Sequence, residues 1–184
     1  MTIVICPGVH PPELTGCFLA GVGDRLSSAL VFPAHKAPPY SGLHLLHFLE
    51  TSLHRSGDRP SLTLIAFSAG VVGAIVAAHL WQWQGGTITA LIALDGWGVP
   101  LYCSFPIHRV SHDAFTHWSS TLLGAGQDGF YADPPCEHLA LWRSPQTLRG
   151  WRVSAQSSPP SATTLACFLQ ELLDQYEPSS DSGS

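Results

Sequence analysis

The sequence predicts an α/β protein: a three-layer α/β/α sandwich around a mostly parallel central sheet of about six strands. Short runs rich in apolar residues, such as Thr2–Cys6, Leu62–Ile65 and Thr87–Leu94, alternate with longer segments of helical character. These runs are apolar almost throughout rather than at every second position, which is typical of strands buried on both faces. The alternation of strands with helices favours parallel pairing, with helices covering the sheet.

The composition predicts one compact domain and argues against nucleic acid as a partner. The chain has 184 residues, of which 45% are hydrophobic and 11% charged. This length suffices for one domain with a substantial core. The formal net charge is −5, and Lys36 is the single lysine beside seven arginines. No basic patch is therefore expected. We expect one domain over residues 1–176 and a disordered tail over residues 177–184.

The cysteines and the N-terminus favour a cytoplasmic protein. The five cysteines are scattered, odd in number and without a Cys-x-x-Cys pair. This pattern indicates reduced thiols rather than a disulfide framework. The chain begins in a strand-like run without a basic region, so no signal peptide is expected. No apolar run reaches transmembrane length, so no integral membrane segment is expected.

Other predicted elements complete the alternating pattern. Pro11 and Glu13 are suited to a first helical turn, and Ser41 is a candidate N-cap. In chain order, these elements are a loop over Pro7–His10, a helix from Pro11, a strand over Ala29–Pro33, a helix over Gly42–His54, strands over Ile107–His112 and Gly129–Ala132, a short helix over Leu139–Ser144, a surface loop over Arg152–Pro160 and an amphipathic helix over Ala162–Tyr176.

The most informative stretch is a strand, a tight turn and a helix between Leu62 and Ala78. The turn reads Ala66-Phe67-Ser68-Ala69-Gly70, with small residues two positions before and after the serine. A nucleophile elbow needs such residues because its sharp turn presses these positions together. The serine would stand at a helix N-terminus, where backbone N–H groups face a substrate. The alternative is an ordinary loop in which Ser68 caps the helix.

Acids and histidines follow this serine in the order that α/β-hydrolases use. Pro7-Gly8-Val9 stands where these enzymes carry an oxyanion loop, and Ala66–Gly70 matches their elbow. Asp113 follows the next-to-last predicted strand, and His138 follows the last one. The chain thus resembles the α/β-hydrolase superfamily, in particular the minimal lidless bacterial lipases and esterases. The resemblance implies the minimal α/β-hydrolase fold without a cap domain.

The resemblance implies a catalytic role for each matching position. Ser68 would be the nucleophile, His138 the general base and Asp113 the acid that orients His138. The backbone N–H groups of Val9 and Ala69 would form the oxyanion hole. We therefore expect a serine hydrolase that cleaves carboxylic esters, as a lipase, esterase or thioesterase, through an acyl-enzyme on Ser68. The expected partner is a small acyl ester, with no cofactor.

Several alternatives remain open at this point. Asp95 also ends a strand and is the alternative acid, while His112 and His117 are alternative bases. The side chains expected to contact substrate are His10, Phe67, Trp97 and Phe115. The alternative function is a catalytically silent hydrolase-like protein that binds a small apolar ligand or a protein partner.

A metal site is the least favoured of the chemistries considered. His108, His112, Asp113 and His117 are close in sequence, but a zinc site needs three or four converging ligands. On a strand, His108 and His112 share a face, whereas His117 lies beyond the turn. No metal is therefore expected.

Overall fold

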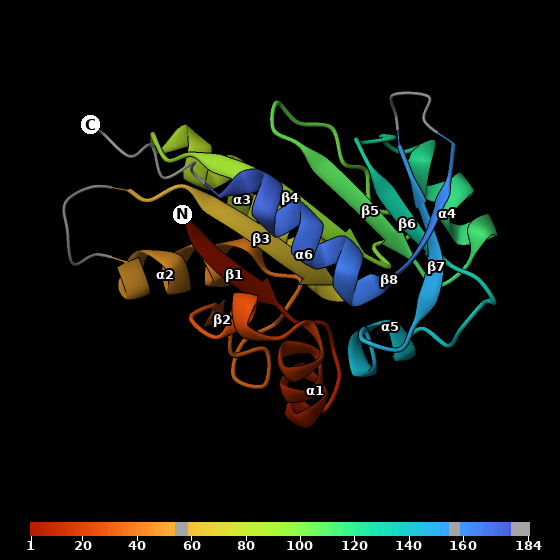
Figure 1. Cartoon of the computed structure of the whole chain (residues 1–184). Coiled ribbons are helices and arrows are strands. Elements are labelled where there is room, and N and C mark those ends of the chain that lie inside the picture. The colour runs from red at the N-terminus through yellow and green to blue at the C-terminus, as the bar shows by residue number, and fades with distance from the viewer. Residues whose placement is uncertain (54–58, 155–158, 178–184) are drawn as a thin grey trace, which may run out of the picture.

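A single, mostly parallel sheet organises the chain. The computed structural model describes residues 1–53, 59–154 and 159–177. Within these residues, eight strands follow the order β2-β1-β3-β4-β5-β6-β7-β8 (Figure 1). They are β1 (Thr2–Cys6), β2 (Leu30–Val31), β3 (Leu62–Phe67), β4 (Ile88–Leu94), β5 (Ile107–Ser111), β6 (Gly129–Ala132), β7 (Arg149–Val153) and β8 (Ser161–Thr164). Strands β1 to β6 pair in parallel, and β7 and β8 extend the sheet antiparallel.

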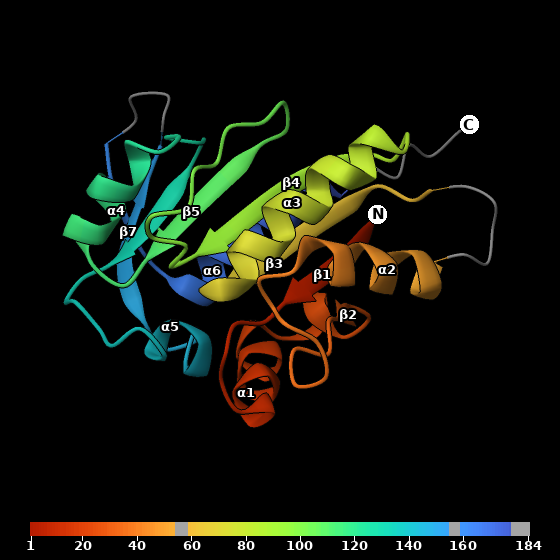
Figure 2. The same cartoon turned by 180° about the vertical axis from the view of Figure 1, so that it is seen from behind.

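Helices cover both faces of this sheet. They are α1 (Pro12–Val22), α2 (Gly42–Leu53), α3 (Ala69–Trp83), α4 (Ala114–Thr121), α5 (Ala140–Arg143) and α6 (Leu165–Tyr176), with a 3-10 turn, η1, at Asp24–Leu26. Buried side chains of α1, α5 and α6 join one core cluster, and those of α2 and α3 join the other. Figure 1 shows α6 across one face, and Figure 2 shows α2 and α3 across the opposite face. No helix in the described ranges is long and apolar enough to cross a membrane.

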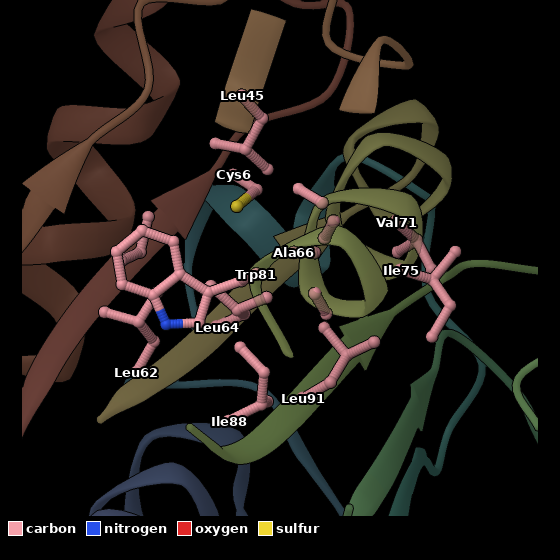
Figure 3. Packing of buried hydrophobic residues seen from close by; sticks show 14 of the residues in the cluster. Cys6, Leu45, Leu62, Leu64, Ala66, Val71, Ile75, Trp81, Ile88 and Leu91 are labelled. Atoms are coloured by element: carbon pink, nitrogen blue, oxygen red, sulfur yellow. The ribbon is translucent and has the colours of Figure 1, made fainter. Parts of the chain in front are cut away.

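The core beneath α3 brings the predicted turn against the sheet. Val71 and Ile75 of α3 and Ala66 of β3 belong to one buried cluster with Leu64 and Leu91 (Figure 3). All six residues of β3 are buried, which explains why its sequence is apolar throughout. Burying a large aliphatic side chain contributes about 1.5–3 kcal/mol. The start of α3, which follows Ser68, is thus held by core packing.

The predicted α/β class and the mostly parallel sheet are confirmed, but the strand count of about six is too low by two in the described residues. The expected surface loop over Arg152–Pro160 is wrong at its start, because β7 continues through Val153; residues 155–158 lie outside the described ranges. The expected final helix also begins later, since Ala162–Thr164 belongs to β8. Both missed strands carry polar or half-exposed residues, so they lack the apolar run of a buried strand. The predicted tail from residue 178 onward and His54 are also outside the described ranges.

The sheet register brings four strand ends to one edge. Cys6 at the end of β1 pairs with Ala66, and Phe67 at the end of β3 pairs with Leu94. Leu94 pairs in turn with Val110, one residue before β5 ends. The residues that follow β1, β3, β4 and β5 therefore meet at the carboxyl edge, where open α/β sheets bind ligands.

Candidate active site

Ser68 occupies a strained turn between β3 and α3. Its φ is 53° and its ψ is −123°, a conformation that side-chain-bearing residues rarely adopt. Its side chain makes no capping hydrogen bond to α3, contrary to the alternative of an ordinary N-cap. The backbone N–H of Ser68 instead donates to the Leu94 carbonyl at 2.8 Å. This bond ties the turn to the end of β4, next to Asp95.

Small residues around the serine are required by close backbone approach. A side chain at Gly70 would collide with the carbonyl oxygens of Cys6 and Pro7. A Cβ at Gly8 would lie 3.0 Å from the Ser68 Cβ and 2.9 Å from the Phe67 carbonyl oxygen. The Pro7–Val9 loop therefore lies directly against the serine turn at Gly8.

Two backbone donors next to the serine are free to bind an anion. Ala69 is the first residue of α3, so its N–H has no partner within the helix. Within the described ranges, neither this N–H nor that of Val9 donates to another backbone group. The partial positive charge of the α3 N-terminus adds to their attraction for negative charge. Together they can stabilise an oxyanion formed on an acyl group at Ser68.

Asp95 is the carboxylate that both His112 and His138 contact. It follows β4 with a φ of 49°, and its side chain is only 2% exposed. His138 Nδ1 lies 2.7 Å from Asp95 Oδ2, and His112 Nδ1 lies 2.8 Å from the same oxygen. The backbone N–H of His112 donates to Asp95 Oδ1 at 3.0 Å. A buried carboxylate with these partners is held in one orientation and can orient an imidazole for proton transfer.

The structure places His138 against Asp95 and not against Asp113, the acid that the sequence favoured. Asp113 caps α4, accepting from the Thr116 backbone N–H at 2.6 Å. This bond is the largest cause that lowers the pKa of the Asp113 carboxyl below its usual value. The histidine nearest to Asp113 is His112, whose Nε2 lies 3.3 Å from Oδ2. The sequence showed two acids at strand ends, but not that a helix would begin at Asp113.

His138 reaches the serine turn by stacking on the residue before Ser68. Its ring lies 4.7 Å from the Phe67 ring, with 22° between their planes. Phe67 is 1% exposed and also stacks on Trp142 of α5, so the predicted substrate contact at Phe67 is replaced by a supporting role beneath His138. In the described residues, Ser68 Oγ forms no hydrogen bond with His138. Such bonds often tighten only when substrate binds.

Ser68 and Asp95 share a property that sequence inspection did not find. They are the only non-glycine residues with positive φ in the described part of the chain. Each such conformation costs about 1–3 kcal/mol, and such positions cluster at functional sites. Here they follow neighbouring strands, β3 and β4, at the same edge of the sheet.

The other predicted site residues lie around this cluster or away from it. His10, on the loop next to the serine, has its ring 5.7 Å from that of Phe67. Trp97 and Phe115 are 65% and 69% exposed and form part of an open surface rather than a pocket. The alternative base His117 packs beside Tyr131 of β6, with ring centroids 5.7 Å apart. Burial lowers the pKa of His117 to about 4, and the charge of Arg109 contributes to the same shift.

A different set of donors from the one considered in sequence could hold a metal. Donor atoms of Asp95, His112 and His138 all lie within 4.8 Å of one another. His108 is directed elsewhere, since its ring nitrogens face the Asp128 carbonyl and the Tyr176 hydroxyl, each at 2.8 Å. The nearby thiol of Cys136 is not an alternative nucleophile, because burial and neighbouring carboxylates raise its pKa to about 11.

Comparisons with family models and curated proteins give no relative, so a function has to be inferred from the geometry of this site. The sequence matches no model of a known protein family and no curated protein.

Proposed function

We propose that this chain is a serine hydrolase that cleaves carboxylic esters through an acyl-enzyme on Ser68. The observation that carries the proposal is the pair of strained residues, Ser68 and Asp95, at adjacent strand ends. His138 lies beside both: its Nδ1 is 2.7 Å from Asp95 Oδ2, and its ring stacks on Phe67, the residue before Ser68. A minimal α/β-hydrolase fold without a cap domain accounts for this arrangement.

The proposed reaction follows from the roles that these atoms can take. Nε2 of His138 accepts the proton as Ser68 Oγ attacks the ester carbonyl. Asp95 keeps the other imidazole proton on Nδ1 and stabilises the charged ring. The N–H groups of Val9 and Ala69 bind the oxyanion. His138 then protonates the leaving alcohol, and water releases the acid by the same steps in reverse.

An uncharged apolar surface beside Asp95 supports an apolar acyl ester as substrate. Trp97, Tyr102, Phe115, Trp118 and Leu122 are all more than half exposed. Segments 96–107 and 114–127 contain no lysine, arginine, aspartate or glutamate. Trp97 Nε1 donates to Ser119 Oγ at 3.0 Å and the Tyr102 hydroxyl donates to the Leu122 carbonyl at 3.2 Å, so the two segments lie together. Such a surface favours contact with hydrocarbon over contact with a charged substrate.

Buried Arg109 holds these two segments in place. Its guanidinium donates to the carbonyl oxygens of Gly124 at 2.6 Å, Leu123 at 2.9 Å and Val99 at 3.3 Å. Burial lowers its pKa to about 10, so it still carries its charge at neutral pH. The backbones of the two segments that carry these aromatic side chains are therefore tied together through Arg109.

Labelling with a fluorophosphonate probe, read by intact mass, tests the nucleophile. We expect one label per chain in the native protein and none in Ser68→Ala. Ser52→Ala, on the exposed side of α2, is the matched control and should label fully. If Ser68→Ala were labelled as fast as the native chain, the nucleophile would be another residue. Unlabelled native protein would then be screened with p-nitrophenyl esters of increasing acyl length.

A second candidate function is a hydrolase-like protein that binds an apolar ligand without catalysis. The observation that favours it is the absence of a hydrogen bond between Ser68 Oγ and His138 in the described residues. A folded native chain that takes up no label would support this function over the first.

A further inference from the structure

Asp95 holds one more histidine than acyl transfer requires. Proton transfer at Ser68 needs a single imidazole oriented by a carboxylate. Here His112 and His138 both direct Nδ1 at the same oxygen, Asp95 Oδ2, at 2.8 and 2.7 Å. The two rings are nearly perpendicular, at 87°, with centroids 6.5 Å apart. Two imidazole nitrogens thus lie close to one carboxylate oxygen, and the three residues come from three segments of the chain.

This donor set suits a transition-metal ion, especially Zn²⁺. Two imidazoles with one carboxylate are a known catalytic zinc ligand set, whereas Mg²⁺ and Ca²⁺ prefer oxygen donors. Metal–ligand bonds of about 2.0–2.1 Å in a tetrahedron place the ligand atoms about 3.3 Å apart. Each Nδ1 must therefore move about half an ångström away from Asp95 Oδ2. The imidazoles can supply this movement, because the side chains of His112 and His138 are 30% and 44% exposed. Their exposure also leaves the fourth position open to water.

The surroundings of His112 match those of a metal ligand. Its other ring nitrogen, Nε2, lies 3.3 Å from Asp113 Oδ2. Metal-bound histidines usually donate their second N–H to a carboxylate or carbonyl, which fixes the ring. On the other side, the His112 backbone N–H fixes Asp95 through Oδ1 and leaves Oδ2 facing the two imidazoles. His112 and Asp95 are therefore already held in the orientation that metal binding needs.

We propose that Asp95 Oδ2, His112 Nδ1 and His138 Nδ1 bind a Zn²⁺ ion, and that this ion inhibits the hydrolase. On binding, each neutral imidazole gives up its Nδ1 proton and takes up one on Nε2, so no net proton is released and the ionised carboxylate is unchanged. A neutral His138 bound through Nδ1 carries its proton on Nε2. That nitrogen then donates rather than accepts, and it cannot take the proton from Ser68. The inhibitory part rests on the proposed function, whereas the binding site does not.

Metal binding is tested directly, without any measure of activity. Native protein freed of metal with a chelator is titrated with Co²⁺, read by its visible spectrum, and with Zn²⁺ in equilibrium dialysis. We expect one ion per chain in the native protein and in Ser68→Ala. His112→Asn, which retains Asp95 and His138, should bind at least tenfold more weakly. His47→Asn, an exposed histidine of α2, is the matched control and should bind like the native chain.

The labelling assay then tests inhibition separately. We expect Zn²⁺ to slow fluorophosphonate labelling of the native chain at least tenfold, and to slow that of His112→Asn much less at the same concentration. No stoichiometric binding by the folded native chain, or equal binding by His112→Asn, would overturn the site. Unchanged or faster labelling with bound Zn²⁺ would overturn the inhibition alone. If the metal-free chain takes up no label, the hydrolase proposal fails while the titration still decides the metal site.

Discussion

Two neighbouring strand ends, each followed by an aspartate, have opposite surroundings. At the end of β4, Asp95 is buried at positive φ and receives two imidazoles. At the end of β5, Asp113 is partly exposed in an extended conformation and caps α4. The histidines differ in the same way, since His138 faces a carboxylate, whereas His117 of α4 is half-buried and its buried Nδ1 has no hydrogen-bond partner. An acid and a histidine in the expected order therefore do not show which acid contacts which histidine; the structure pairs His138 with the buried Asp95.

The largest effect is expected when the Asp95 carboxylate is removed. Asp95→Asn keeps the size of the side chain but cannot hold His138 as a base with the proton on Nδ1. We expect the rate of fluorophosphonate labelling to fall by about 10³–10⁴-fold. Asp133→Asn is the matched control and should label normally, because the exposed Asp133 carboxylate accepts only from Trp151 Nε1, at 2.8 Å, among the side-chain hydrogen bonds of the described residues. A loss below tenfold for folded Asp95→Asn would remove Asp95 from the catalytic machinery.

The sequence predicted the parallel part of the sheet well because β1, β3 and β4 are largely apolar runs. β3 and β4 differ by two residues or fewer at either end from the expected strands, and the turn at Ser68 lies where the small residues indicated. The antiparallel end, β7 and β8, was missed because its residues are polar or half-exposed and its pairing depends on β6. Strand pairing of this kind is a tertiary property that periodicity does not report.

Asp113 was preferred to Asp95 as the acid because helix α4 was not foreseen. Its sequence, Ala114–Thr121, contains threonine, serine, histidine and aromatic residues, which are weak helix formers. Without a helix after it, Asp113 has no visible role as a cap and becomes a candidate for catalysis. The burial of Asp95 and the second histidine on it depend on how β4, β5 and the loop before α5 meet, which no local pattern contains.

A moderate effect on stability is expected from His117, the half-buried histidine of α4. Because burial lowers the pKa of His117 to about 4, the folded chain binds fewer protons there than the unfolded chain, whose histidine has a pKa of about 6.5. The stability that His117 contributes is therefore complete above about pH 6.5 and is lost as the pH falls toward 4. Between pH 7 and pH 5 we expect this residue to lower the free energy of unfolding by about 2 kcal/mol.

Urea unfolding of the native chain and of His117→Gln at both pH values measures this contribution. The difference in stability between pH 7 and pH 5 should be about 2 kcal/mol smaller in His117→Gln. The exposed His47→Gln should retain the native pH dependence. If His117→Gln retained it as well, His117 would be accessible to protons in the folded state, and the contrast with His138 would disappear.

The smallest effect is expected at the second strand end. Asp113→Ala removes the carboxylate that accepts from the Thr116 N–H, and loss of such an N-cap costs about 1 kcal/mol. In a chain of this size the melting temperature should fall by about 2–4 °C. Thr164→Ala is the matched control, because Thr164 caps α6 by accepting from the Cys167 N–H at 3.2 Å, remote from Ser68 in sequence. Both variants should lose similar stability and label within about threefold of the native rate. A fall in labelling for Asp113→Ala as large as that for Asp95→Asn would mean that the two carboxylates act together through His112, and that the strand ends are one site.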